Sequence, residues 1–254
     1  MRFPMSPLVI SCIVFGIIFG GALAGMVLRV LLPEHHLEQD SRDVVKLGMG
    51  LVATMSALVL GLLIASAKSS YDTQRAGLAQ MSANVILLDR VLDHYGPETK
   101  AIRQQVRQEA EALLQRIWSN AEGTSARIEP TNNSEGVYEA IQRLTPKNDG
   151  QRTLQTAAIK TAIDVAQARW LLFTQRSSAI PVPFLVVMVF WLAMIFASFS
   201  LFARPNATVV VTLLVCALSV SGAIFLILEL DRPFDGVMQI SSFPVHRALD
   251  QLGR

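Results

Sequence analysis

Four long apolar segments constrain the fold of this chain more than any other feature. They are residues Leu8 to Leu32, Val44 to Ala67, Ile180 to Ala203 and Ala207 to Leu230. A helix of about 20 residues, rising about 1.5 Å per residue, crosses a hydrocarbon core about 30 Å thick. Hydrophobic residues make up 52% of the chain and charged residues only 17%, which is too apolar for an ordinary soluble domain. The sequence therefore predicts an integral membrane protein with four transmembrane helices.

A more polar segment, residues 68–179, separates the second span from the third. Apolar residues recur there at alternating steps of three and four, as in helices that bury one seam. Gly96-Pro97 and Thr145-Pro146 are expected to end helices. The first and last seams are long enough to pack antiparallel as a helical hairpin. The four seams are Leu78, Met81, Val85, Leu88, Leu92 and Tyr95; Ile102, Val106, Leu113 and Ile117; Val137, Ile141 and Leu144; and Leu154, Ala158, Thr161, Val165, Ala168 and Leu172.

The predicted fold class is all-α, because no strand-like alternation, Gly-rich phosphate loop or internal repeat interrupts the helical pattern. Four parts are expected. They are a first transmembrane helix pair with a short external loop (1–67), a cytoplasmic helical stalk or bundle (68–179), a second transmembrane pair (180–230) and a short cytoplasmic C-terminal tail (231–254).

Basic residues near the span ends predict the orientation, since cytoplasmic flanks carry an excess of lysine and arginine. With four spans inserted, eight basic residues lie on the side of the insert and of both termini, against four on the other side. The first set is Arg2, Lys68, Arg75, Lys160, Arg169, Arg176, Arg232 and Arg247, and the second is Arg29, Arg42, Lys46 and Arg204. The insert and both termini are therefore expected to be cytoplasmic.

Glycines in the first span predict close helix packing. Gly16 and Gly20, and likewise Gly21 and Gly25, are four residues apart, which places small residues where another helix backbone can approach. The same region also resembles a cleavable signal peptide, with Ala22-Leu23-Ala24 as its small-residue site. The apolar run continues past that site to Leu32, which favours a retained span.

Polar side chains gather where the second and fourth spans end. Both ends face the same side in the predicted topology, and paired charges are tolerated at a membrane edge where unpaired ones are costly. We therefore expect one cytoplasmic polar cluster, although spacing alone favours an ordinary salt-bridged helix terminus. The candidates are Lys68, Ser70, Tyr71, Asp72 and Arg75 after the second span, and Glu229, Asp231 and Arg232 after the fourth.

These two stretches, LGLLIASAKSSYDTQRAG and LELDRPFDG, resemble sequences of a bacterial family of bestrophin-like membrane proteins. The resemblance to this family extends over nearly the whole chain. A more distant resemblance is to bestrophin ion channels, whose second span also runs into a polar stretch with a tyrosine and an arginine. Pro233 and Phe234 match the later Pro-Phe-Gly motif of those channels, but Asp235 precedes the glycine and no long acidic tail follows. The resemblance implies an all-helical homo-oligomer in the inner membrane of a bacterium, assembled as a ring around a pore lined by the second span. The two departures from the channel motif argue against a calcium clasp.

Two stripes on the second span fit such a pore, because one can face a neighbouring helix and the other a narrow apolar constriction. Packing inside a four-helix bundle is the alternative. No charge lies in the span core, so ion selectivity would come from the rims, where Lys68 and Arg75 favour anions while Asp72 and Glu229 oppose them. The bulky stripe is Leu51, Met55, Leu58 and Leu62, and the small one is Gly50, Thr54, Ala57 and Gly61.

Other function classes have little support. A net charge of +2 with no basic patch argues against nucleic-acid binding. The four histidines carry no catalytic signature, so no enzyme activity, cofactor or metal site is predicted. His35-His36, in a short acidic loop, is more typical of a solvated linker than of a metal site. The alternative to an ion channel is a non-conducting membrane scaffold or sensor whose cytoplasmic helices bind a partner protein.

Overall fold

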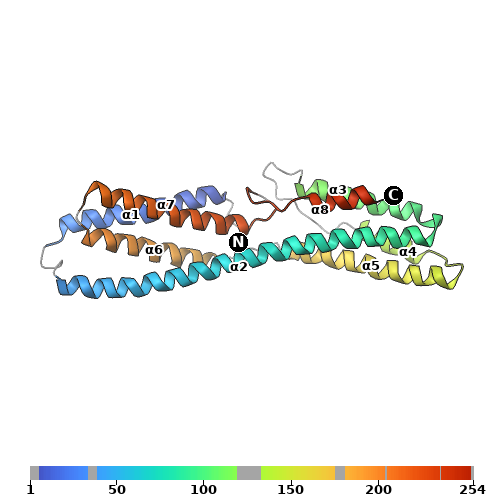
Figure 1. Ribbon diagram of the computed structural model, residues 1–254, viewed down its shortest axis with the longest axis horizontal. Helices are drawn as coiled ribbons and strands as arrows, with labels where there is room; N and C mark the ends of the chain where they lie inside the picture. Colours follow the sequence, from blue (N-terminus) through green and yellow to red (C-terminus); the bar gives the residue numbers. More distant parts are fainter. Residues whose placement is uncertain are drawn as a thin grey trace. The chain divides into compact units, whose positions relative to one another are not determined.

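The computed structural model describes residues 6–33, 39–118, 133–174, 181–203, 205–234 and 236–252, and these residues form helices and connecting segments without a strand (Figure 1). The helices are α1 (Pro7–Leu31), α2 (Gln39–Tyr95), the 3-10 helix η2 (Pro97–Thr99), α3 (Lys100–Trp118), α4 (Asn133–Gln142), α5 (Asp149–Thr174), α6 (Val182–Phe202), α7 (Ala207–Leu230) and α8 (Phe243–Gln251). The predicted all-α fold is confirmed.

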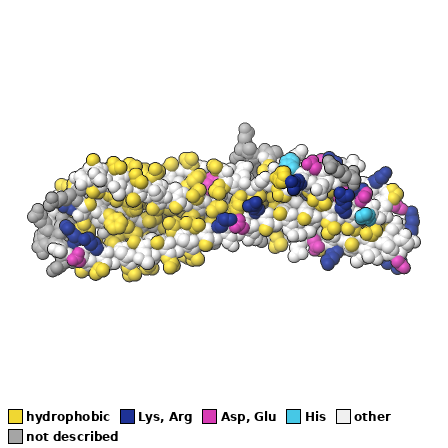
Figure 2. Space-filling view, viewed as in Figure 1, with side chains coloured by type: hydrophobic (Ala, Val, Ile, Leu, Met, Phe, Trp, Pro, Cys, Tyr) yellow, Lys and Arg dark blue, Asp and Glu magenta, His cyan; other side chains and the backbone are white. Residues whose placement is uncertain are grey.

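The chain divides into two compact units. The membrane unit comprises Met1–Ser70 and Ser178–Arg232, and the bundle unit comprises Tyr71–Ser177 and Pro233–Arg254. Four helices (α1, α2, α6 and α7) are long and apolar enough to cross a membrane. The visible surface over α1, α6 and α7 is mostly hydrophobic, whereas charged side chains are spread over the bundle unit (Figure 2). The apolar helices agree with the four spans predicted from the sequence.

Helix α1 lies against both α6 and α7 in the membrane unit. At one end of this unit, the Arg29 Nη1 donates to the Leu201 carbonyl at 3.4 Å, and the Arg42 guanidinium lies 5.7 Å from the centre of the Phe202 ring. The start of α2 therefore lies beside the end of α6. Because α7 begins a few residues after that end, capped by the Asn206 side chain, α2 and α7 run in the same direction through this unit.

The bundle unit is held together by two layers of buried apolar side chains. Both layers draw on α2, α3 and α5, as the predicted seams require. Gln151 Nε2 donates to the Tyr95 carbonyl at 3.0 Å, so the start of α5 lies beside the end of α2 and the two helices are antiparallel. One layer contains Leu78, Met81, Leu113, Ile117, Leu172, Phe234, Ile240 and Val245, and the other contains Leu88, Leu92, Ile102, Val106, Val137, Ile141 and Ala158.

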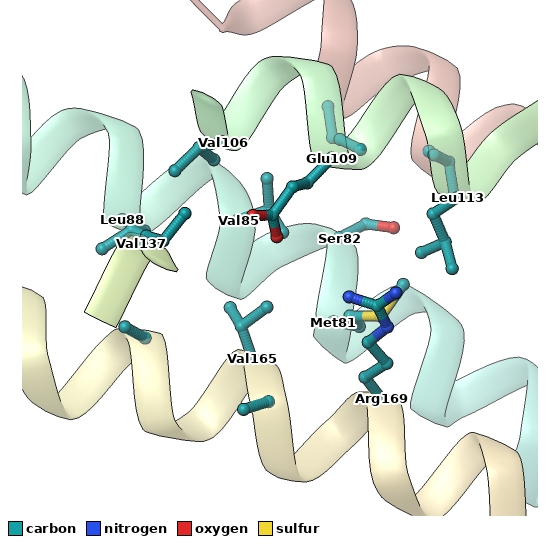
Figure 3. A pocket seen from close by; sticks show the side chains of 15 residues that line it. Met81, Ser82, Val85, Leu88, Val106, Glu109, Leu113, Val137, Val165 and Arg169 are labelled. Carbon is teal, nitrogen blue, oxygen red and sulfur yellow. The ribbon is translucent and has the colours of Figure 1, made fainter. Parts of the chain in front are cut away.

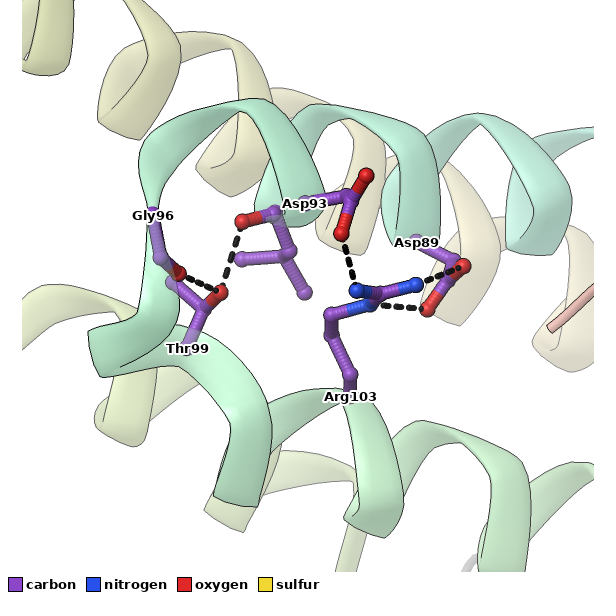
Figure 4. A network of polar contacts seen from close by, with 6 residues as sticks. Asp89, Asp93, Gly96, Thr99 and Arg103 are labelled. Carbon is purple, nitrogen blue, oxygen red and sulfur yellow. Dashed lines mark hydrogen bonds and ion pairs between the residues drawn. The ribbon is translucent and has the colours of Figure 1, made fainter. Parts of the chain in front are cut away.

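A tight turn connects α2 to α3 at the predicted Gly96-Pro97. Gly96 has a φ of 134°, which favours glycine, and the fully buried Thr99 holds the turn (Figure 4). The Thr99 hydroxyl donates to the Leu92 carbonyl at 2.6 Å, and the Gly96 carbonyl shares this proton at 2.8 Å. One of the last carbonyls of α2, that of Leu92, is thereby satisfied by a side chain.

The C-terminal segment belongs to the bundle unit and contributes to its core. Phe234 and Ile240 lie in one apolar layer, and the Ile240 amide donates to the Pro233 carbonyl at 2.7 Å. Trp118 Nε1 in turn donates to the Ile240 carbonyl at 3.1 Å, and its ring meets Phe234 edge-on. Val245 of α8 is buried as well. The sequence predicts only a short tail here, because the packing of this segment depends on Trp118 and on helices distant along the chain.

Candidate functional site

The apolar half of α2 is the least buried of the four apolar helices. Its buried face carries Ser56, Leu63 and Ala67. The four candidate pore residues lie on the other side, with exposed fractions of 66% for Leu51, 47% for Met55, 72% for Leu58 and 66% for Leu62. The small stripe, Gly50, Thr54, Ala57 and Gly61, is also exposed. Both stripes are therefore uncovered in a single chain and available to lipid, to a neighbouring copy or to a pore.

The glycines of α1 divide into two pairs with different surroundings. A Cβ atom added to Gly21 would lie 2.9 Å from the Ala193 carbonyl oxygen of α6, and one added to Gly25 would lie 2.2 Å from that of Ala197. These two positions let the backbones of α1 and α6 approach closely. Gly16 and Gly20 have no such neighbour within 4 Å among the described residues, so they do not serve packing within this unit.

The predicted polar residues lie at the end of the apolar part of α2 and at the end of α7. Since the two helices run in the same direction, Lys68 and Glu229 are at the same end of the membrane unit. Glu229 is buried, with only 3% of its surface exposed, whereas Lys68 is exposed and Asp231 and Arg232 are half-buried. A buried carboxylate at the end of a membrane helix is costly and commonly marks an ion or proton pathway.

The remaining residues of the predicted cluster divide between the two units. Ser70 is the last residue of α2 in the membrane unit and is half-buried. Tyr71 begins the bundle unit, where it packs on the apolar layer of Leu78 and Phe234, and Asp72 and Arg75 are exposed on the following turn. The structure therefore assigns the eight candidates to two separate units, and a single cluster remains a prediction.

An ion-pair network links α2 to α3 (Figure 4) and was not predicted from the sequence. Arg103 donates from Nε to Asp89 Oδ1 at 2.7 Å and from Nη2 to Asp89 Oδ2 at 2.9 Å, and it also pairs with Asp93. Asp89 is only 2% exposed. The Asp89 hydrogen bonds raise the pKa of Arg103 above its ordinary value, so the guanidinium stays charged.

A pocket of about 70 Å³ lies in the bundle unit and is lined by α2, α3, α4, α5 and α8 (Figure 3). Its walls are mainly apolar, but Glu109 of α3 and Arg169 of α5 enter it from facing helices. Burial raises the pKa of Glu109, although the Arg169 charge opposes this shift. Burial likewise lowers the pKa of Arg169, against the attraction of Glu109. The sequence indicates Arg169 only as part of the basic bias, although it directly follows the seam residue Ala168, and Glu109 lies at helical spacing between the seam residues Val106 and Leu113.

Within the described part of the chain, no group of three or more histidine, cysteine or acidic side chains is arranged to hold a metal ion. The His35-His36 pair lies outside the described residues. Cys12 and Cys216 are free thiols on α1 and α7.

Comparison with known proteins connects these features to one family. A search of curated proteins and a search of solved structures both gave no match. A family model described as the Bestrophin-like domain matches residues 16–245, which takes in α1 from Gly16 onward, the other three apolar helices and most of the bundle unit. This extent agrees with the resemblance noted at the ends of the second and fourth spans. The chain is thus a membrane protein that belongs to the bestrophin-like domain family.

Proposed function

We propose that this protein is a homo-oligomeric ion channel whose pore is lined by the apolar half of α2. The observation that carries the proposal is the exposure of both stripes on this helix in a single chain. A ring of copies would cover the small stripe with a neighbouring helix and turn Leu51, Met55, Leu58 and Leu62 toward the axis. Membership of the bestrophin-like family supports the same arrangement.

The proposed pore has an apolar constriction and a polar mouth. No charged residue lies between Lys46 and Lys68, so the constriction would gate by excluding water rather than by binding ions. Lys68 and Glu229, at one end of the membrane unit, would meet ions at the mouth. We place this mouth, both termini and the bundle unit in the cytoplasm of a bacterium with the protein in the inner membrane, as the distribution of basic residues favours.

A non-conducting scaffold or sensor is the second candidate, and one observation favours it. The bundle unit exposes large apolar side chains on three helices, which are Leu87 on α2, Ile163, Trp170 and Leu171 on α5, and Phe243 on α8. Exposed apolar groups of this size are typical of surfaces that bind a partner. A second copy of the chain would cover them in a channel, whereas a different protein would cover them in a scaffold.

Ion flux through liposomes containing the purified protein tests the channel. Leu58→Ala combined with Leu62→Ala should widen the constriction and raise the flux several-fold over the unaltered protein. Leu214→Ala with Leu218→Ala is the matched control, because these two leucines have the same spacing and are also exposed, but on α7. The control should leave the flux unchanged.

The oligomeric mass of each protein in detergent completes this test. A ring that forms normally yet passes no ions, with or without the α2 substitutions, would favour the scaffold. An equal rise in flux for the α2 and α7 variants would show that the substitutions merely loosen the membrane unit, and the assignment of α2 to the pore would then be wrong.

A further inference from the structure

The pocket inside the bundle unit has the shape of a ligand site with an apolar interior. Val85, Val106, Val137 and Val165 contribute to its walls from four different helices. Along α2 the pocket extends from Met81 to Leu88, which is about 10 Å at about 1.5 Å per residue. This length suits a medium-chain acyl group, and the volume of about 70 Å³ exceeds the space that one water molecule needs.

Two opposite charges enter this apolar space without pairing with each other. Arg169 and Glu109 face one another across the pocket (Figure 3), and no salt bridge joins these two described side chains. Arg169 Nε is buried and has no hydrogen-bond partner among the described residues. Buried donors are almost always satisfied in folded proteins, so this nitrogen calls for an acceptor from a ligand or from water.

A second hollow adjoins the apolar pocket and is more polar. It has a volume of about 230 Å³ and shares Glu109, Leu113 and Arg169 with the pocket, while Gln105, Gln108, Ala112 and Arg116 complete it. The Arg116 charge acts on Arg169 and lowers its pKa further. Arg169 and Glu109 therefore lie where the two hollows meet, while Arg116 lines the second hollow alone. The Arg169 guanidinium favours an anionic group on a ligand at this place.

We propose that the bundle unit binds an amphipathic carboxylate, with its acyl chain in the apolar pocket and its carboxylate on Arg169. The planar guanidinium offers two parallel donors, and a carboxylate matches them with two oxygens. The bound carboxylate would supply the acceptor that Arg169 Nε lacks. Glu109, which already accepts a hydrogen bond from Gln105 at 3.5 Å, would repel the ligand and keep its affinity moderate.

Photo-crosslinking of the full-length protein tests this site. The probe is decanoate carrying a diazirine on its chain, added to the purified protein in lipid nanodiscs, with the crosslinked peptides identified by mass spectrometry. Crosslinks are expected on the α2 peptide from Met81 to Leu88 and on α5 around Val165. Unlabelled decanoate should compete for them, whereas decanol and decyltrimethylammonium should not, since neither offers a carboxylate.

Substitutions then separate the carboxylate site from a mere cavity. Arg169→Gln should lower the labelling about tenfold, which is the loss of one charge-assisted pair. Arg107→Gln is the matched control, because Arg107 pairs with Glu111 on the exposed face of α3 at 3.0 Å, and it should label normally. Glu109→Gln should raise the labelling at low probe concentration. Val165→Phe should abolish labelling by filling the pocket while Arg169 stays in place.

Each opposite result would overturn the proposal. Equal competition by decanol would leave an apolar cavity without a carboxylate site, and competition by decyltrimethylammonium alone, lost in Glu109→Gln, would make the ligand a cation. Absence of pocket crosslinks would mean that water fills the space. Gel filtration and tryptophan fluorescence show whether Arg169→Gln folds. If it does not, the competitor series and Val165→Phe still test whether the pocket binds a carboxylate. The proposal is independent of ion conduction, because labelling does not require a pore.

Discussion

Charged residues among apolar neighbours are the main chemical feature of the bundle unit at the residue scale. The seam pattern predicted the apolar positions of α2, α3 and α5 because it counts hydrophobic residues at a helical period. It did not detect Asp89, which directly follows the seam residue Leu88 and is just as deeply buried. Its partner Arg103 lies across the turn at Gly96. Such pairing depends on how two antiparallel helices align with each other, and the spacing of side chains within one helix does not predict that alignment.

Arg103→Gln should destabilise the bundle unit by about 3–5 kcal/mol, because the buried Asp89 carboxylate would lose both hydrogen bonds from the Arg103 guanidinium. Urea unfolding of the protein in detergent, followed by tryptophan fluorescence, measures this loss. Arg107→Gln removes an exposed pair with Glu111 on the same helix and should cost about 0.5 kcal/mol or less. Equal losses for the two variants would contradict a structural role for the buried pair.

Glu109→Gln should stabilise the protein at neutral pH. Burial raises the pKa of Glu109 above its ordinary value, so the folded state favours the protonated carboxyl. Because the pKa of Glu109 is higher in the folded protein than in the unfolded one, its protonated carboxyl stabilises the folded state at pH values below the unfolded-state pKa. This stabilisation is lost as the pH rises through the folded-state pKa. The stability difference between the two proteins should therefore grow from about pH 4 toward pH 7. A melting temperature measured across that range checks this, and a constant difference would refute it.

At the element scale, α2 is a single helix where the sequence predicts a membrane span and a separate helix of the insert. The predicted span Val44–Ala67 and the seam from Leu78 to Tyr95 are one helix of 57 residues. No proline interrupts it, and its stop at Gly96-Pro97 was correctly predicted because that dipeptide forces a turn. The glycines of α1 were harder to interpret. Both pairs have the same spacing, and only the direction of α6 decides which pair it contacts.

Gly25→Ala should weaken the contact between α1 and α6. The added Cβ would lie 2.2 Å from the Ala197 carbonyl oxygen, so the helices would have to separate, at a cost of about 1–3 kcal/mol. Gly16→Ala is the control, since no neighbour lies within 4 Å of its added Cβ among the described residues. Thermal unfolding in detergent should show a lower melting temperature for Gly25→Ala alone. A comparable drop for Gly16→Ala would mean that another copy covers that face.

At the scale of the whole molecule, the sequence predicted the helical class and four spans because apolar length and period are local properties. It did not predict that Pro233–Arg254 joins the bundle unit, because that packing depends on Trp118 and on a layer assembled from distant helices. Ring assembly is still harder to predict from the sequence. It depends on how the exposed α2 stripes meet other copies, and one chain holds no record of that contact.

Membrane topology is the prediction that belongs to this scale. Eight basic residues against four favour a cytoplasmic bundle unit, since translocating lysine and arginine across the inner membrane is disfavoured. In a protein with Cys12 and Cys216 replaced by alanine, Gln104→Cys places a thiol on the exposed face of α3, and Pro205→Cys places one between α6 and α7. An impermeant maleimide added to intact cells should label Pro205→Cys and reach Gln104→Cys only after lysis. Efficient labelling of Gln104→Cys in intact cells would invert the topology, and the proposed polar mouth of Lys68 and Glu229 would then face the periplasm.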